Sequence, residues 1–150
     1  MKRIDYVLVL VLDMASGHVV GLTKKKGPAF LLNKLTFPGG KTEPGESALI
    51  ASQRETLEET GLDLPLADFS VFEVVQGADY TLTKVVVCTD KVLYARTMEE
   101  EPIWHLEFKH HLQYCLCQPS QYAPDFHSTL KAALASPAAL AATLEVASAA

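Results

Sequence analysis

Short apolar runs along the chain predict a series of β-strands. Residues 6–12 are continuously apolar, which favours a central strand buried on both faces. Residues 13–17 carry turn-forming side chains, so residues 18–23 are expected to return as the second strand of a hairpin. The pattern predicts a partly extended segment over residues 30–37 and further strands over residues 69–75, 81–89, 92–95, 104–108 and 113–117.

Helical patterns occupy the middle and the end of the chain, and glycine and proline interrupt it elsewhere. Residues 46–60 predict the first helix, and Gly61 stands where a C-cap glycine belongs. Residues 124–135 predict a second helix, and Ser136-Pro137 is expected to begin a short third one. Loops are expected where glycine, proline or charged residues gather, at residues 24–28, 38–40 and 99–102.

Length and order of elements point to one α/β domain over residues 1–150. A chain of 150 residues that is 49% hydrophobic can bury a full core, and it contains no internal repeat or linker. The last dozen residues are rich in alanine, and both a short helix and a frayed tail fit them. We assign no chemistry to that segment.

Net charge and cysteine content limit the binding partners and the cellular compartment that we expect for this protein. The net charge of -5 argues against a nucleic acid or an anionic membrane as partner, since both require a basic face. Three cysteines in a chain of this size indicate a reduced, cytoplasmic protein, and the apolar run near the N-terminus is too short to span a bilayer. Cys115 and Cys117 match no common zinc spacing and are expected to be buried or half-buried thiols on one face of a strand.

Three glutamates lie close together in the predicted first helix, at positions 55, 58 and 59. Residues three and four apart are neighbours on a helix, so like charges there oppose helix formation by about a few tenths of a kcal/mol per pair. The face that carries Glu55 and Glu59, with Glu58 at its edge, otherwise holds small residues, namely Ala48, Ala51 and Ser52. Small side chains allow close approach, so we expect the acids to dock against the fold. A solvated acidic helix is the alternative.

The segment that contains these acids resembles the signature of the Nudix hydrolases. That signature is Gly, five residues, Glu, seven residues, and then Arg-Glu-U-x-Glu-Glu-x-Gly-U, where U is a bulky aliphatic residue. The one departure is Thr56, which occupies an aliphatic position beside Leu49 and Thr60 and is expected to cost some stability. The resemblance implies an α/β/α sandwich around a central mixed β-sheet. The matching residues are Gly40, Glu46, Arg54, Glu55, Glu58, Glu59, Gly61 and Leu62.

The resemblance also implies a metal site on this helix. Glu55, Glu58 and Glu59, with the backbone carbonyl of Gly39, would bind Mg²⁺, or Mn²⁺ in its place. Mg²⁺ prefers oxygen ligands and usually takes one or two carboxylates together with substrate phosphates and waters. A bound cation would relieve the repulsion between crowded carboxylates.

Catalytic and supporting roles follow from the same resemblance. Glu55 would position or deprotonate the attacking water, and Glu59 would act with it at the reacting phosphate. Arg54 would orient the glutamates through a salt bridge. Glu46 and Gly40 would shape the junction between the loop and the helix.

The implied reaction is hydrolysis of the pyrophosphate linkage in a nucleoside diphosphate derivative, most simply a nucleoside triphosphate. Lys24 is a candidate to meet a distal phosphate, with a solvated lysine turn as the alternative. Glu101, in the acidic run 99–101, is a candidate for substrate binding, again with a solvated turn as the alternative. Aromatic side chains that could stack on a base, or else pack in the core, are Phe37 and Tyr80 first, then Phe30, Trp104 and Phe126.

Other functions remain open from the sequence alone. A Nudix-like module that senses a nucleotide without cleaving it is one, although such modules usually lose a glutamate of the signature and none is lost here. An ADP-ribose, nucleotide-sugar or dinucleoside polyphosphate hydrolase is another, and a plain scaffold with a wet acidic helix is a third. The oligomeric state is not determined, and a homodimer is left open.

Overall fold

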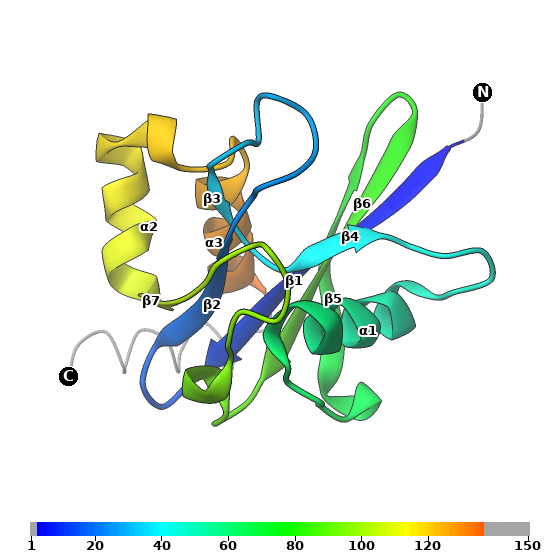
Figure 1. Ribbon diagram of the computed structural model, residues 1–150, viewed down its shortest axis with the longest axis horizontal. Helices are drawn as coiled ribbons and strands as arrows, with labels where there is room; N and C mark the ends of the chain where they lie inside the picture. Colours follow the sequence, from blue (N-terminus) through cyan, green and yellow to red (C-terminus); the bar gives the residue numbers. More distant parts are fainter. Residues whose placement is uncertain (1–2, 137–150) are drawn as a thin grey trace.

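A single mixed β-sheet organises the protein, whose computed structural model describes residues 3–136 (Figure 1). The expected third helix at Ser136-Pro137 and the alanine-rich segment therefore fall outside the described range. The main strand order is β3-β2-β1-β6-β5, while β4 pairs with β1 and β7 pairs with β2. The strands are β1 (Ile4–Asp13), β2 (His18–Thr23), β3 (Leu35–Thr36), β4 (Gly39–Lys41), β5 (Phe69–Gln76), β6 (Tyr80–Cys88) and β7 (Ile103–Glu107).

The centre of the sheet is a parallel pair of strands. β1 and β6 run side by side in parallel from Ile4↔Tyr80 to Leu12↔Cys88, and the other pairings are antiparallel. Four consecutive residues of β1, 9–12, are at most 1% exposed. This is the double-sided burial that the continuous apolar run predicted, because a central strand needs apolar residues on both faces.

Helices cover both faces of the sheet and complete an α/β/α sandwich (Figure 1). Alternate residues of β1 point to opposite faces. Leu10 and Leu12 pack toward the side of α2 (Phe108–Cys117) and α3 (Phe126–Ala135). Val9 and Val11 belong to the core on the other face, which α1 (Ala48–Thr60) adjoins through Leu49. The expected α/β class and mixed sheet are confirmed.

Three elements differ from the sequence expectation. Residues 113–117 belong to helix α2 and not to a strand, and Cys115 is buried while Cys117 is exposed, so the thiols do not share one face. Residues 92–94, expected to be part of a strand over 92–95, form a 3₁₀ turn in which only Val92 is buried, because the N–H of Ala95 donates back to the carbonyl of Val92 at 3.1 Å. Gly39 and Gly40, expected to belong to a loop over residues 38–40, are part of strand β4, which pairs with the middle of β1. Within residues 30–37, only β3 is a strand.

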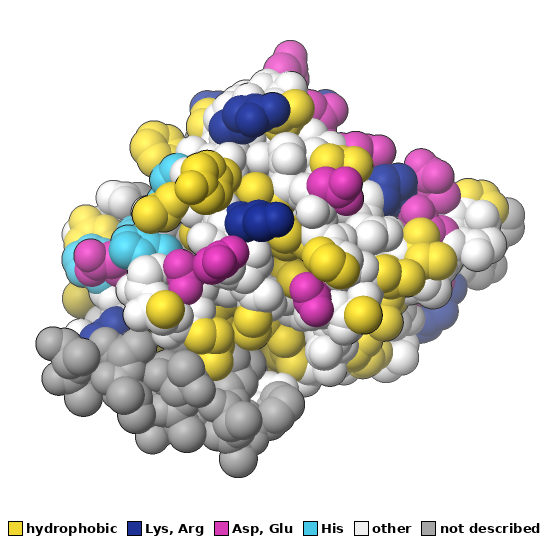
Figure 2. Space-filling model, turned by 90° about the horizontal axis from the view of Figure 1, so that it is seen from below, with side chains coloured by type: hydrophobic (Ala, Val, Ile, Leu, Met, Phe, Trp, Pro, Cys, Tyr) yellow, Lys and Arg dark blue, Asp and Glu magenta, His cyan; other side chains and the backbone are white. Residues whose placement is uncertain are grey.

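Surface composition agrees with the net charge. On the face seen in Figure 2, acidic, basic and hydrophobic side chains are interspersed, so the described residues present no broad basic area on this face. No helix among residues 3–136 has the length and hydrophobicity needed to cross a bilayer.

Candidate active site

Helix α1 begins and ends on local signals that set the register of its acids. Ser47 caps its first turn by accepting a hydrogen bond from the backbone N–H of Ile50 at 3.2 Å, so the helix starts at Ala48, two residues later than expected. Gly61 ends it in the left-handed conformation, with φ of 77°, as its C-cap position predicted. Between these caps, Glu55 and Glu59 lie one turn apart on the same face.

Glu59 docks against strand β4, which runs beside the centre of the sheet. It is 7% exposed, and its Oε1 accepts a hydrogen bond from the backbone N–H of Gly39 at 2.8 Å. Glu59 and Glu55 therefore lie on the face that packs against the fold, as the small residues of α1 predicted, whereas the side chain of Glu58 is 50% exposed at the edge of that face. Ala51 and Ser52 on that face are fully buried.

Two glycines make this close approach possible. A Cβ on Gly39 would lie 2.1 Å from the carbonyl oxygen of Val7, so only glycine fits between β4 and β1. A Cβ on Gly40 would lie 2.7 Å from Oε1 of Glu55, so the carboxylate occupies the space that a side chain would need. The packing of strand against strand thus explains the glycine at position 39, and the packing of helix against strand explains the signature glycine at position 40.

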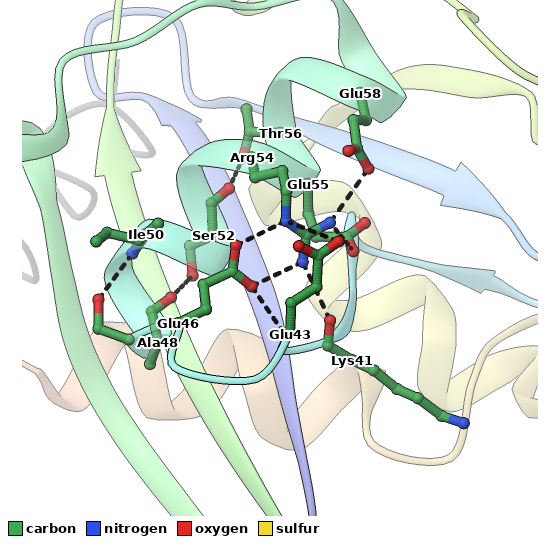
Figure 3. A network of polar contacts seen from close by, with 11 residues as sticks. Lys41, Glu43, Glu46, Ala48, Ile50, Ser52, Arg54, Glu55, Thr56 and Glu58 are labelled. Carbon is green, nitrogen blue, oxygen red and sulfur yellow. Dashed lines mark hydrogen bonds and ion pairs between the residues drawn. The ribbon is translucent and has the colours of Figure 1, made fainter.

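Arg54 ties the acids of the junction together (Figure 3). Its Nε and Nη2 donate to the two oxygens of Glu46 at 2.8 Å and 2.9 Å, a bidentate pair. Its Nη1 lies 3.0 Å from Oε1 of Glu55 and 3.3 Å from Oε2 of Glu58. Nη2 also donates to the carbonyl of Lys41 in β4 at 3.2 Å. The guanidinium therefore holds helix, loop and strand in one geometry.

The electrostatics of the cluster differ from one carboxyl to the next. The hydrogen bond from Arg54 lowers the pKa of Glu46 to about 2. Burial raises the pKa of Glu59 to about 8, with the charges of Glu55 and Glu101 adding to the effect. Burial also raises the pKa of Glu55. Burial thus disfavours the ionised forms of Glu55 and Glu59, and in Glu55 it outweighs the opposing effect of Arg54.

A cavity of about 780 Å³ opens beside Glu59. Gly39 and Glu59 line it together with Lys24, Phe37 and Tyr80, so the structure brings these five predicted site residues to one place. Phe37 is only 2% exposed and stacks on Phe126 at a centroid distance of 4.7 Å. It therefore forms part of the cavity floor and leaves little ring surface free to stack on a base.

Other predicted residues do not line the cavity, namely Arg54, Glu55, Glu58, Glu101, Trp104 and Phe126. Glu99 and Glu100 are exposed, whereas Glu101 is 7% exposed and faces the loop that follows β2. Of the other aromatic candidates, Phe30 lines the cavity, Phe126 is in the core, and Trp104 donates its indole N–H to Thr23 at 2.8 Å.

Several lining residues escaped the sequence reasoning. Tyr6, Leu8 and Leu82 project from the paired strands β1 and β6, and Pro124 and Asp125 come from the segment before α3. In the sequence the first three look like ordinary strand residues, and Pro124 and Asp125 look like the start of the helix predicted over residues 124–135, which begins only at Phe126. Only the pairing of distant strands shows that they face a common space.

The chemistry of the donors suits a hard cation. Within residues 3–136, no three His, Cys, Asp or Glu side chains converge to hold a metal ion unaided. Mg²⁺ does not require such a cage, because it usually binds one or two carboxylates and completes its shell with phosphates and waters. Glu55 and Glu59, two carboxylates with raised pKa values, fit that pattern.

Comparison with known proteins places the chain among recognisable relatives. A family model described as NUDIX domain matches residues 2–136. An 8-oxo-dGTP diphosphatase of Escherichia coli (strain K12) is 33% identical over 76 residues, which are 51% of this chain and 56% of that protein. The alignment thus spans little more than half of that curated relative.

Solved structures of low sequence identity share the fold. A MutT structure, from work on Aliivibrio salmonicida and Vibrio cholerae, has a TM-score of 0.63 at 22% identity, covering 75% of this chain and 86% of that one. An ADP compounds hydrolase has a TM-score of 0.67 at 19% identity, covering 87% of this chain and 71% of that one.

Proposed function

The chain belongs to the Nudix family, and from this premise we propose that it is a hydrolase that cleaves the pyrophosphate linkage of a nucleoside triphosphate or a related nucleotide with the help of Mg²⁺ or Mn²⁺. The observation that carries the proposal is the position of Glu59. Its carboxylate joins the acids of α1 to a cavity whose walls also carry Lys24 and Tyr80. The proposed site of phosphate chemistry is therefore adjacent to the proposed site of base binding.

Three carboxylates and one carbonyl are the proposed ligands of the cation. Glu55, Glu58 and Glu59 supply carboxylate oxygens from α1, and Gly39 supplies its backbone carbonyl from β4. When bound, Mg²⁺ supplies positive charge that offsets the charge of the phosphoryl oxygens and of the leaving phosphate. Burial raises the pKa of both Glu55 and Glu59, so their ionised forms are disfavoured without added positive charge, and this is the electrostatic reason for a cation here.

Glu55 is the proposed general base. Its carboxylate accepts a proton from the attacking water while the water oxygen forms a bond to phosphorus and the bond to the bridging oxygen breaks. Arg54 keeps Glu55 in place through the contact at 3.0 Å and is itself held by Glu46. Arg54 is thus a positioning residue.

The cavity supplies the proposed recognition of the nucleotide. Lys24 meets a distal phosphate, and Phe30 and Tyr80 offer ring faces or edges to a base. The relative named as an 8-oxo-dGTP diphosphatase and the neighbour named as an ADP compounds hydrolase both support a nucleotide as substrate class. We propose further that the protein acts in the cytoplasm, on small molecules and not on nucleic acid or membranes.

A substrate panel tests the proposal. The protein would be incubated with nucleoside triphosphates, 8-oxo-dGTP, ADP-ribose, NADH, nucleotide sugars and dinucleoside polyphosphates, with and without Mg²⁺, and released phosphate, pyrophosphate and monophosphates would be measured. We expect turnover of at least one member that requires the cation. Tight binding with no turnover of any member would instead favour a nucleotide sensor.

A further inference from the structure

The loop over residues 24–34, which follows β2, forms the outer wall of the cavity. Two backbone hydrogen bonds close its base: Lys24 donates to the carbonyl of Lys34 at 3.0 Å, and Asn33 donates to the carbonyl of Lys24 at 2.7 Å. The outer part of the loop carries Phe30 and Leu31, which line the cavity. The position of this loop therefore sets how tightly the cavity closes around a ligand.

Glu101 binds the near side of this loop. Its Oε2 accepts the backbone N–H of Lys25 at 2.8 Å and lies 3.7 Å from Nζ of Lys24. The residue is 7% exposed, yet it is not part of the cavity wall. A buried carboxylate is stable only when such partners are present. Without them its charge would be unpaired, and without the carboxylate the N–H of Lys25 would lose its acceptor. Both contacts are with the loop, and one of them is with Lys24, which lines the cavity.

The segment that carries Glu101 is itself anchored to the sheet. The backbone N–H of Ile103 donates to Oγ1 of Thr97 at 3.0 Å and so closes the acidic loop. The N–H of Thr23 donates to the carbonyl of Pro102 at 3.0 Å. Trp104 adds its indole hydrogen bond to Thr23. Glu101 therefore extends from a fixed support, which is what an anchor for a long loop requires.

We propose that Glu101 is a positioning residue that tethers residues 24–34 and thereby sets the affinity of the cavity for its nucleotide, without contacting the reacting atoms. The part that concerns affinity rests on the function proposed above. The part that concerns the tether does not, because it can be measured in the absence of any substrate.

Amide hydrogen exchange in the protein without ligand tests the tether. Glu101→Ala removes both contacts, and Glu101→Gln keeps an oxygen that can accept from Lys25 but loses the charge that pairs with Lys24. We expect the rate of amide exchange in residues 24–34 to rise by about tenfold in Glu101→Ala, because a hydrogen bond to a charged acceptor is lost. The rise should be smaller in Glu101→Gln, because an acceptor for Lys25 remains. Glu100→Ala, an exposed neighbour in the same acidic loop, is the matched control and should leave exchange unchanged.

Steady-state kinetics with Mg²⁺ and dGTP, or with the panel member that is turned over fastest, test the consequence. A looser wall should raise KM about tenfold in Glu101→Ala while kcat stays within about threefold, since the lost contacts order the binding site and not the transition state. Unchanged exchange in residues 24–34 would overturn the tether. Faster exchange with an unchanged KM, or a large fall in kcat at constant KM, would overturn the link to affinity. Absence of any turnover would contradict the proposed function and leave the exchange result valid.

Discussion

Glu59 joins the helix of acids, strand β4 and the cavity in one side chain. It accepts from Gly39, lines the cavity, and is the acid whose pKa is raised to about 8. Loss of its charge should therefore damage the chemistry more than the fold.

We expect Glu59→Gln to lower kcat by about a hundredfold or more, because one of the proposed metal ligands is lost. The amide can still accept from Gly39, so the circular dichroism spectrum and the melting temperature should change little. Asp63→Asn, the same chemical change at an exposed position, is the control. Activity of Glu59→Gln equal to that of the wild type would remove Glu59 from the site.

The two glycines of β4 allow an experiment that separates stability from activity. Gly39→Ala places a Cβ against the backbone of Val7, which cannot move without breaking the β1–β4 pairing, so we expect a loss of about 2 kcal/mol in the free energy of unfolding. Gly40→Ala meets only the flexible carboxylate of Glu55, so we expect less than about 1 kcal/mol of destabilisation with a fall in kcat of about tenfold or more. Urea denaturation and initial rates measure the two effects.

Equal destabilisation by both substitutions would contradict this assignment of the two contacts, as would full activity in Gly40→Ala. The comparison is informative because the two positions are adjacent and undergo the same chemical change.

Glu46 should make stability depend on pH. Its folded-state pKa of about 2 lies below the ordinary value of 4.5, so its ion pair with Arg54 stabilises the protein above pH 4.5 and loses that effect as the pH falls from 4.5 towards 2. The carboxylate is only 10% exposed, so solvent screens the pair weakly. We expect Glu46→Gln to cost about 1–2 kcal/mol at pH 7, with the difference from wild type shrinking below about pH 4.5.

Urea denaturation of both proteins across this range gives the measurement. A difference that stays constant from pH 7 to pH 3 would mean that the charge of Glu46 is not what stabilises the junction.

At the scale of elements, α1 carries the proposed catalytic acids on one face and two fully buried threonines, Thr56 and Thr60. Thr56 stands where the Nudix signature has an aliphatic residue, and it is fully buried, with its hydroxyl bonded to the carbonyl of Ser52 at 2.7 Å. Thr60 is also fully buried, but its hydroxyl both donates to Thr56 and accepts the N–H of Leu62 at 3.2 Å. The Thr56 hydroxyl bonds only to a carbonyl of its own helix. The Thr60 hydroxyl also satisfies the N–H of Leu62 and so helps to end the helix.

The two threonines should therefore respond in opposite directions to the same change. Thr56→Val should raise the free energy of unfolding by about 0.5–1 kcal/mol, since a methyl replaces a hydroxyl that no other group depends on. Thr60→Val should lower it by about 1–2 kcal/mol, because the N–H of Leu62 loses an acceptor. Thermal and urea denaturation test the pair, and destabilisation of similar size in both variants would refute the distinction.

At the scale of the whole molecule, the proposed site lies where helix α1 meets strand β4 and where the sheet, the 24–34 loop and the segment before α3 enclose a cavity. A cation bound there should stabilise the entire fold, because ligands that bind only the native state shift the unfolding equilibrium.

Mg²⁺ at about a hundred times its dissociation constant should add about 2.7 kcal/mol, which for a chain of this length corresponds to a rise in Tm of about 5–10 °C. The rise should be much smaller in Glu59→Gln, and Na⁺ at matched ionic strength is the control. An equal rise in the variant, or none in the wild type, would contradict a cation site at Glu59.

Part of this structure could be predicted from the sequence, because it depends only on residues that are close together in the chain. A helix repeats every 3.6 residues regardless of its surroundings, so the spacing of Glu55 and Glu59 fixed their common face before any fold was known. The capping signal of Gly61 and the continuous apolar run of β1 are equally local, and the structure bears them out.

Tertiary structure decided what local signals cannot encode. Strand β4 has three residues, two of them glycine, and it exists only because β1 offers it hydrogen bonds. Helix α2 was mistaken for a strand over residues 113–117, since a short apolar stretch fits either period until the neighbours are known. The contact between Glu101 and Lys25 spans 76 positions, and that between Glu59 and Gly39 spans 20. The sequence alone determined which acids share a face, and long-range pairing determined what that face meets, because only the folded chain brings distant backbone within reach of a side chain.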